Sequence, residues 1–204
     1  MKTTIVIYGS STGSCQSIAE TIASKLGVEA VDVANIDDAT ITSHENLLLG
    51  TSTWGAGEMQ DDWYDGVKTL KSAGLAGKTV ALFGCGDSES YPDTFCGGMK
   101  ELYDAAVEAG ATVLPGVSTN GYTYDDSEAI DGDKFLGLAL DEVNEDDKTI
   151  DIEEAKKAAS KKQNTSGDSS AGGDSSTDGE HTSGGSTTGG STDGEGSDGD
   201  NVSL

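Results

Sequence analysis

A loop of small hydroxyl residues follows the first apolar run of the chain. The run and the loop read Ile5, Val6, Ile7, Tyr8, Gly9, Ser10, Ser11, Thr12, Gly13, Ser14 and Cys15. Backbone N–H groups in such a loop, together with the positive end of a helix that begins near Ser14, can bind a phosphate without a cation. The loop contains no Lys or Arg. It therefore predicts a phosphate-binding site, although a simple strand-to-helix connection can have the same composition.

The spacing of residues in this loop excludes two common ligand classes. A nucleoside-triphosphate loop needs the pattern G-x-x-x-x-G-K-[ST], and a dinucleotide-binding loop needs G-x-G-x-x-G. Neither pattern occurs at this position of the chain.

Two later loops each present an aromatic residue among small and polar ones. Trp54 lies in the loop 53–60 beside two glycines, and Tyr91 lies in the loop 84–95. A Trp in a glycine-rich loop offers a flat face to a ligand, whereas a core aromatic such as Trp63 lies on the apolar face of a helix. Trp54 and Tyr91 therefore predict a slot for a planar ring system.

The elements that must position these loops alternate along the chain. Apolar runs predict strands at 5–7, 28–33, 46–52, 79–83 and 111–117, and helices fit at 14–26, 61–72 and 94–109. Within the last two helices the shared apolar faces are Trp63, Val67 and Leu70, and then Phe95, Met99, Leu102, Ala106 and Val107. This order predicts an α/β fold with a doubly wound, five-stranded parallel sheet and helices on both faces. The loops 9–14, 53–60 and 84–95 should then meet at the carboxyl edge of the sheet, where such folds bind ligands.

Composition divides the chain into two parts. Residues 1–160 mix apolar runs and turns, as in one domain of ordinary size. Residues 161–204 are mainly Gly, Ser, Thr and Asp, which cannot bury enough apolar surface to offset the entropy of ordering. We therefore expect one folded domain followed by a disordered acidic tail.

The formal net charge of the 204-residue chain is −25, and most of it lies on the predicted domain. Residues 161–204 carry eight acidic and two lysine side chains, which leaves 29 acidic and 10 lysine side chains on residues 1–160. The chain has no arginine, so a nucleic-acid partner is not expected. Partner proteins with basic docking surfaces would suit this charge. General solvation of a salt-adapted surface is the alternative explanation.

The three cysteines, Cys15, Cys85 and Cys96, are too few for a disulfide framework and do not match a zinc spacing. They indicate a reducing compartment, and we expect a cytoplasmic protein without a metal site. The N-terminus has no signal-like apolar stretch, and no segment of the sequence reaches 18 apolar residues, so neither secretion nor a membrane span is expected.

Three motifs of the chain, in order and at matching spacing, resemble those of the flavodoxins. The family patterns [ST]-x-T-G-x-T, T-W-x-x-G-E-[LM]-Q and G-x-G-D-x(3)-Y-x-D-x-F correspond to residues 10–15, 53–60 and 84–95. The resemblance covers the chain to about residue 160. Residues 118–142 also resemble the extra loop of long-chain flavodoxins, which interrupts the fifth strand.

The resemblance implies a low-potential one-electron carrier that binds FMN noncovalently, substitutes for ferredoxin, and passes electrons from a reductase to an acceptor as a monomer. It implies no catalytic residue. The cofactor-binding residues that it assigns are Ser10, Ser11, Thr12, Gly13, Ser14 and Cys15 for the phosphate, Trp54 and Tyr91 for the ring, Gly55, Gly57, Cys85 and Gly86 for its polar edge, and Thr53, Ala56, Asp87, Asp93 and Phe95 in the same loops. The Gly55–Ala56 peptide could turn its carbonyl toward the flavin, because glycine tolerates the backbone change.

The chain departs from the family in two places. Cys15 replaces the usual Thr and exchanges a good hydroxyl donor for a weak S–H, which predicts somewhat weaker FMN binding. The closing helix, expected from residue 150 to about residue 162, carries few large apolar residues, which predicts looser packing.

Other proteins with a related fold remain as alternatives. An FMN-dependent quinone reductase would need an open substrate pocket over the flavin, which stacking of Tyr91 would block. A response-regulator receiver requires acidic residues after the first strand, where this chain has Tyr8, Gly9 and Ser10.

Overall fold

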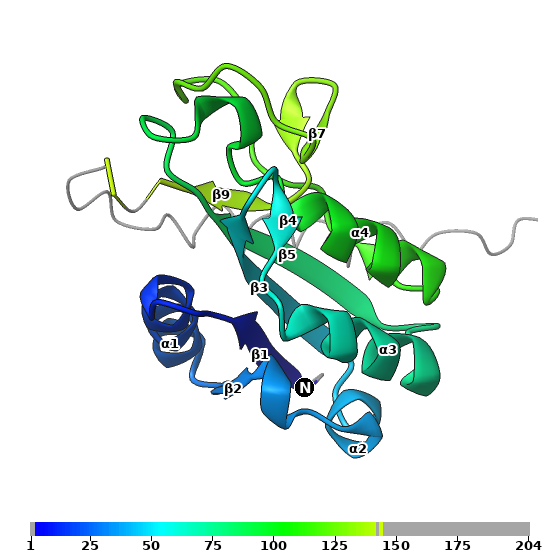
Figure 1. The fold of residues 1–204 in the computed structure, drawn as a ribbon. Helices are drawn as coiled ribbons and strands as arrows, with labels where there is room; N and C mark the ends of the chain where they lie inside the picture. The colour runs from blue at the N-terminus through cyan, green and yellow to red at the C-terminus, as the bar shows by residue number, and fades with distance from the viewer. Residues whose placement is uncertain (1–2, 142, 145–204) are drawn as a thin grey trace, which may run out of the picture. The chain divides into compact units, whose positions relative to one another are not determined.

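The computed structural model describes residues 3–141 and 143–144. A parallel sheet runs through it in the order β2, β1, β3, β5, β6 (Figure 1). The bounds of these strands are Glu29–Asp32 for β2, Thr4–Gly9 for β1, Asn46–Trp54 for β3, Thr79–Cys85 for β5 and Thr112–Val113 for β6. The five-stranded, doubly wound sheet predicted from the sequence is therefore confirmed. The predicted tail at 161–204 and the closing helix expected from residue 150 lie outside the described residues.

The fifth strand is divided into two pieces. Strand β6 pairs with the start of β5, at Val80↔Val113, and strand β9 (Leu138–Leu140) pairs with its end, at Phe83↔Leu138. Between them lies an insertion with a small antiparallel pair, β7 (Ile130–Asp131) and β8 (Lys134–Phe135). The predicted strand 111–117 is thus wrong beyond residue 113. Pro115 has no N–H to donate to the ladder, so the chain leaves the sheet there.

Helix α1 spans Ser14–Leu26, as predicted, and α3 spans Trp63–Ala73. The predicted helix 94–109 was too long, because α4 is Met99–Glu108 and is preceded by a 3-10 turn, η2 (Pro92–Thr94). Cys96 between them has a φ of 53°, which an α-helix does not allow. Short elements that were not predicted include the 3-10 turn η1 (Val33–Asn35), helix α2 (Asp38–Thr42) and strand β4 (Glu58–Met59).

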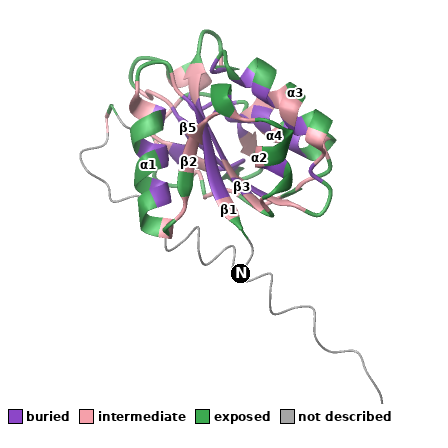
Figure 2. Cartoon of the chain, turned by 90° about the horizontal axis from the view of Figure 1, so that it is seen from below, coloured by how far each residue is buried: buried purple, intermediate pink, exposed green. Residues whose placement is uncertain are grey.

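The helices form two layers on the sheet. Helix α1 covers one face, and α3 and α4 cover the other (Figure 1). Successive side chains of β1 alternate accordingly: Ile5 and Ile7 pack on the α3 and α4 side, and Val6 on the α1 side. The central strands β1, β3 and β5 are mostly buried, the edge strand β2 is half-buried to exposed, and the outer faces of the helices are exposed (Figure 2). Val107, predicted on the apolar face of α4, is 48% exposed and does not belong to the core.

This topology brings three strand ends to one edge of the sheet. The register pairs Gly9 at the end of β1 with Thr51 in β3, and Ser52 in β3 with Cys85 at the end of β5. The direction of strand addition reverses between β1 and β3, and folds of this type bind ligands at such a point. The three loops expected to line the site therefore leave the sheet side by side.

Candidate functional site

The loop after β1 is organised by its own residues and by α1. The Ser10 hydroxyl accepts a hydrogen bond from the Gly13 backbone N–H at 3.1 Å, which closes the loop. Gly13 is the N-cap of α1 with a φ of 98°, a left-handed conformation that suits glycine. In the described part of the chain no side chain caps this helix. The first backbone N–H groups of α1 are therefore available to an anion.

The hydroxyl groups of this loop are accessible, but the thiol is not. Ser11 and Thr12 are exposed, and Ser14 is half-buried. Cys15 is 0% exposed and packs with Val6 and Ile18 in the core between α1 and the sheet. This burial argues against a contact of the thiol with a phosphate, because the side chain packs in the core. Only the backbone N–H of Cys15 remains as a candidate contact.

Close packing joins the first loop to the second. A Cβ at Gly9 would lie 2.5 Å from both Gln60 Oε1 and Trp63 Cδ1, so only glycine fits at the end of β1. Buried Gln60 donates through Nε2 to Asp62 Oδ2 at 2.8 Å and to the Ser11 hydroxyl at 3.4 Å. The position of the phosphate loop is thus tied to the residues that follow β4.

The second loop is a tight hairpin between β3 and β4. Trp54 pairs with Glu58, and the Gly57 N–H donates to the Trp54 carbonyl at 3.0 Å. Gly55 has a φ of 54°, and the Ala56 N–H donates to Glu58 Oε2 at 2.6 Å. The tip residues 55–57 are exposed or half-buried and carry no polar side chain, so only their backbone groups can offer hydrogen bonds there.

The two aromatic residues predicted to hold a ring are both accessible. Trp54 at the end of β3 is 43% exposed, and its indole N–H donates to the Ser52 hydroxyl at 2.9 Å. Tyr91, in the loop after the neighbouring strand β5, is 64% exposed. Leaving such large apolar rings exposed to water costs free energy. Two exposed aromatics in loops after neighbouring strands therefore indicate a binding surface. The Thr53 side chain serves a different purpose, since its hydroxyl accepts from the Gly98 N–H at 3.3 Å.

Asp87 organises the third loop. Its Oδ1 accepts from the backbone N–H of Ser90 at 3.0 Å and of Glu89 at 3.2 Å, and its carbonyl accepts from the Tyr91 N–H at 3.0 Å. Hydrogen bonds from Asn144 and from Ser90 lower the pKa of Asp87 to about 2. The carboxylate is therefore ionised at neutral pH and fixes the turn that carries Tyr91.

The remaining predicted residues of the third loop are divided between surface and core. Gly86 is half-buried and Asp93 is exposed, whereas Cys85 is buried on the α1 side of the sheet. Phe95 is 1% exposed and packs against Tyr124, with ring centroids 5.7 Å apart, and against Phe135 at 5.9 Å. This burial argues against a direct contact of Phe95 with a ligand, because its ring packs on the aromatic residues of the insertion.

A fourth segment at this edge was missed by sequence reasoning. After β9, Asp141 and Asn144 reach the loop after β5: the Ser88 N–H donates to Asp141 Oδ1 at 3.3 Å, and Asn144 donates to Asp87. The Gly86 N–H also donates to the Leu140 carbonyl at 3.0 Å. No spacing signal in the sequence connects these positions, which lie more than 50 residues apart.

The arrangement suits a ligand that combines a phosphate with a planar ring. A cation-free loop with accessible N–H and hydroxyl groups lies beside a hairpin tip and two exposed aromatics. The second and third loops carry the carboxylates of Glu58, Asp87 and Asp93, and residues 10–14, 53–62 and 84–95 contain no basic side chain. Among the described residues, no group of His, Cys, Asp and Glu side chains could hold a metal ion. No helix of the described ranges is long and apolar enough to cross a membrane.

Comparison with known proteins gives a consistent result. Residues 6–158 match the family model for flavodoxin. The chain is 40% identical over 151 residues to flavodoxin 1 of Azotobacter vinelandii, covering 71% of this chain and 87% of that protein. It is 38% identical over 155 residues to flavodoxin 1 of Escherichia coli K12, covering 74% and 88%. A crystal structure of Fusobacterium nucleatum flavodoxin bound to flavin mononucleotide superimposes with a TM-score of 0.66 at 36% identity, covering 71% of this chain and 88% of that one.

Proposed function

This chain belongs to the flavodoxin family, and from that premise we infer that it is an electron-transfer protein with FMN as its cofactor, not an enzyme. The bound flavin supplies the redox chemistry, because it can accept and return single electrons. The protein supplies binding, orientation and the electrostatic field. The observation that carries the proposal is the phosphate-type loop beside two exposed aromatics at one sheet edge. A flavin-dependent quinone reductase is not favoured, since the relatives above are flavodoxins.

Each part of FMN has candidate contacts in the described loops. Residues 10–14 and the first N–H groups of α1 would hold the phosphate, and Trp54 and Tyr91 would hold the ring. Backbone groups near Gly55, Gly57, Cys85 and Gly86 would meet the polar edge of the ring. The side chains of Cys15 and Phe95 would instead support these loops from the core.

The β3–β4 hairpin is placed to adjust the hydrogen bonds offered to the flavin. The Gly55–Ala56 peptide lies at its tip, and Gly55 already has a positive φ. The Ala56 N–H donates to the Glu58 carboxylate, so any turn of this peptide must exchange that hydrogen bond for another. Nearby carboxylates disfavour adding negative charge to the ring, which lowers the potential at which the last electron enters.

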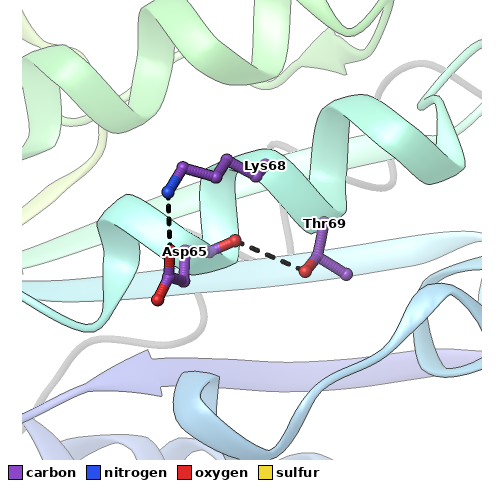
Figure 3. Close-up of polar contacts among 3 residues, drawn as sticks. All are labelled: Asp65, Lys68 and Thr69. Atoms are coloured by element: carbon purple, nitrogen blue, oxygen red, sulfur yellow. Dashed lines mark hydrogen bonds and ion pairs between the residues drawn. The ribbon is translucent and has the colours of Figure 1, made fainter.

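We propose that the partner surface lies beside the same hairpin. Tyr64 on α3 is 45% exposed, and partial burial together with the carboxylates of Glu101 and Glu58 raises its pKa. Lys68 on the same helix is paired with Asp65 at 2.7 Å, so it offsets a charge of its own helix (Figure 3). A redox partner with a basic docking surface complements this rim and would associate faster at low salt.

Three further assignments follow as proposals. The division of the fifth strand into β6 and β9 supports a long-chain flavodoxin. The three buried cysteines form no disulfide with one another, which supports residence in a reducing compartment such as the cytoplasm. The chain would act as a monomer, with a folded domain at 1–160 and an extension at 161–204.

Titration of the apoprotein with FMN tests the central proposal. We expect a yellow one-to-one complex, detected by loss of flavin fluorescence. Trp54→Ala and Tyr91→Ala should each weaken FMN binding by about tenfold or more, because each removes a stacking surface. Tyr64→Ala is the matched control, since this equally exposed aromatic lies outside the three loops. A protein that cannot be reconstituted with FMN would refute the assignment.

A second measurement tests the partner surface. Reduction by a flavoprotein reductase with a basic surface should slow as salt concentration rises, and Tyr64→Ala should slow it without changing FMN affinity. A reduction rate that does not depend on salt would contradict the proposal of a basic docking partner. It would not affect the assignment of FMN as the cofactor.

A further inference from the structure

The turn that carries Tyr91 is built from local hydrogen bonds that do not fix its place on the sheet. The side chain of Asp87 accepts from the N–H groups of Glu89 and Ser90, and its carbonyl accepts from Tyr91. All of these partners lie within residues 87–91. The N–H groups of Asp125 and Asp126 in the insertion also donate to the carbonyl of the next residue, Pro92, each at 3.0 Å. The position of Tyr91 therefore depends on these contacts and on what holds the Asp87 carboxylate.

Asn144 holds that carboxylate from outside the loop. Its Nδ2 lies 2.9 Å from Asp87 Oδ1 and 2.8 Å from Asp141 Oδ1. An amide nitrogen carries two hydrogens, so it can donate to both carboxylates at once. This orientation of the amide follows from its partners, because both are acceptors only.

Asp141 provides the fixed end of the arrangement. It is 7% exposed, directly follows β9, and accepts from both the backbone N–H and the hydroxyl of Ser88. Strand β9 is itself paired with the end of β5, through Cys85↔Leu140. The loop after β5 is thus attached to the sheet at Ser88 and, through Asn144, at Asp87.

A neutral donor is suited to this place. Two carboxylates that approach one another need shared hydrogen bonds to offset their repulsion. A lysine would supply them but would add positive charge beside an otherwise cation-free site. Asn144 supplies them and leaves the negative field unchanged. The lowered pKa of Asp87, whose largest cause is this hydrogen bond, agrees with the geometry.

We propose that Asn144 is a positioning residue for FMN binding, which bridges Asp87 to Asp141 and so holds Tyr91 where the flavin ring needs it. The inference rests on the proposed function, because it takes FMN as the ligand of this edge. It extends the site to a residue that touches neither the phosphate loop nor the hairpin tip in the described contacts.

The test compares Asn144→Leu with a matched control, Asn120→Leu, which alters an exposed amide in the insertion. In Asn144→Leu, FMN affinity should fall by about tenfold, since two charge-assisted hydrogen bonds are lost. In its apoprotein, the Ser90 and Tyr91 amides should exchange hydrogen faster, while the Gly13 amide is unchanged. Asn120→Leu should change none of these quantities. Asn144→Gln should recover part of the affinity, because it restores the amide donor.

A readout independent of the flavin separates positioning from general stabilisation. The Ser90 amide resonance of the apoprotein should follow the ionisation of Asp87, with a higher midpoint pH in Asn144→Leu than in the wild type. Asp141 and Glu89 are the other titratable groups beside Asp87, so Glu89→Gln serves to assign the transition. Should Asn144→Leu fail to fold, Asn144→Asp takes its place, because a third carboxylate should weaken FMN binding while keeping the side-chain size.

The possible results separate this inference from the proposed function. Wild-type protein that does not bind FMN would refute the function. Wild-type protein that binds FMN, with Asn144→Leu binding it equally well and an unchanged Ser90 midpoint, would overturn the role of Asn144 alone. Weaker binding with faster Ser90 and Tyr91 exchange would support it.

Discussion

The loop after β1 and the loop after β5 leave the same edge of the sheet, and both are proposed to bind FMN. Different kinds of contact fix their positions. The first is closed by a hydrogen bond from Gly13 to Ser10 and continues directly into α1. The second carries Tyr91 on a turn whose outside supports include Asp141 and Asn144, more than 50 residues later, and the N–H groups of Asp125 and Asp126, which donate to the Pro92 carbonyl. One loop is thus shaped mainly by neighbours in sequence and the other by neighbours in space.

This difference separates two tasks. A phosphate needs several N–H groups at fixed spacing, which a strand-to-helix turn supplies from contiguous residues. Stacking on a ring needs one aromatic side chain in a fixed position. In the β5 loop, contacts from segments later in the chain fix that position. We therefore expect changes in remote residues to affect the β5 loop more than the β1 loop.

The largest expected effect comes from removing the remote support. Asp141→Ala should lower the free energy of unfolding by about 1–2 kcal/mol, because the half-buried donors of Ser88 and Asn144 lose an acceptor. Ser10→Ala removes the local hydrogen bond of the β1 loop and should cost about 0.5–1 kcal/mol. Urea unfolding of the two apoproteins measures both values. Equal losses would show that the two loops do not differ in how they are held.

Gly55→Val tests the hairpin that lies between the two loops. Its φ is 54° and a Cβ would lie 2.2 Å from Glu58 Oε2, so valine should cost about 1–2 kcal/mol and displace the Ala56 N–H from Glu58. Both one-electron potentials of bound FMN should shift in a redox titration. Gly121→Val is the matched control, since Gly121 also has a positive φ but lies in the insertion with open space around it. Unchanged potentials in Gly55→Val would reject a role for this peptide.

Low pH should affect the β5 loop and not the β1 loop, with a smaller effect than the substitutions above. The pKa of Asp87 is about 2 in the folded chain against an ordinary 3.8, so its ionised form stabilises the β5 loop above pH 3.8, and that contribution is lost as pH falls toward 2. Residues 10–14 carry no ionisable side chain. An NMR titration should therefore move the Ser90 amide in this window and leave the Gly13 amide in place, and Asp87→Asn should abolish the Ser90 transition. Parallel movement of both amides would instead indicate that acid unfolds the whole edge.

The smallest effect on ligand binding should come from Cys15→Thr. The hydroxyl would enter the core beneath α1, so the free energy of unfolding should fall by about 1 kcal/mol while FMN affinity changes by less than about twofold. Fluorescence titration and urea unfolding give the two values. A large gain in affinity would mean that this side chain reaches the phosphate after all.

Features that depend on neighbouring residues in the sequence could be predicted, whereas features that depend on distant segments could not. The bounds of α1 and the order of the sheet depend on periodicity and on loops between consecutive elements, and both were predicted. Burial of Cys15 was also within reach, because it lies three residues before Ile18 on one face of α1. The helical periodicity predicts a buried Cys15, whereas the loop motif predicts a contact of Cys15 with the phosphate.

Other features depended on segments that come later in the chain. Phe95 was expected at the ligand, but its burial is provided by Tyr124 and Phe135 from the insertion. Asp141 and Asn144 find their partners only when β9 pairs with β5. Short elements such as α2 and β4 give too few residues for a periodic pattern to identify them.

The divided fifth strand has a consequence for engineering. Because β6 and β9 are each paired with β5 independently, the connection between them need not be continuous for either piece to keep its place. The turn at Asn120 and Gly121 is exposed and has open space around it. New chain termini, or an inserted reporter domain, placed at this turn should leave the sheet intact. The protein thus contains a natural site for circular permutation in the insertion between β6 and β9.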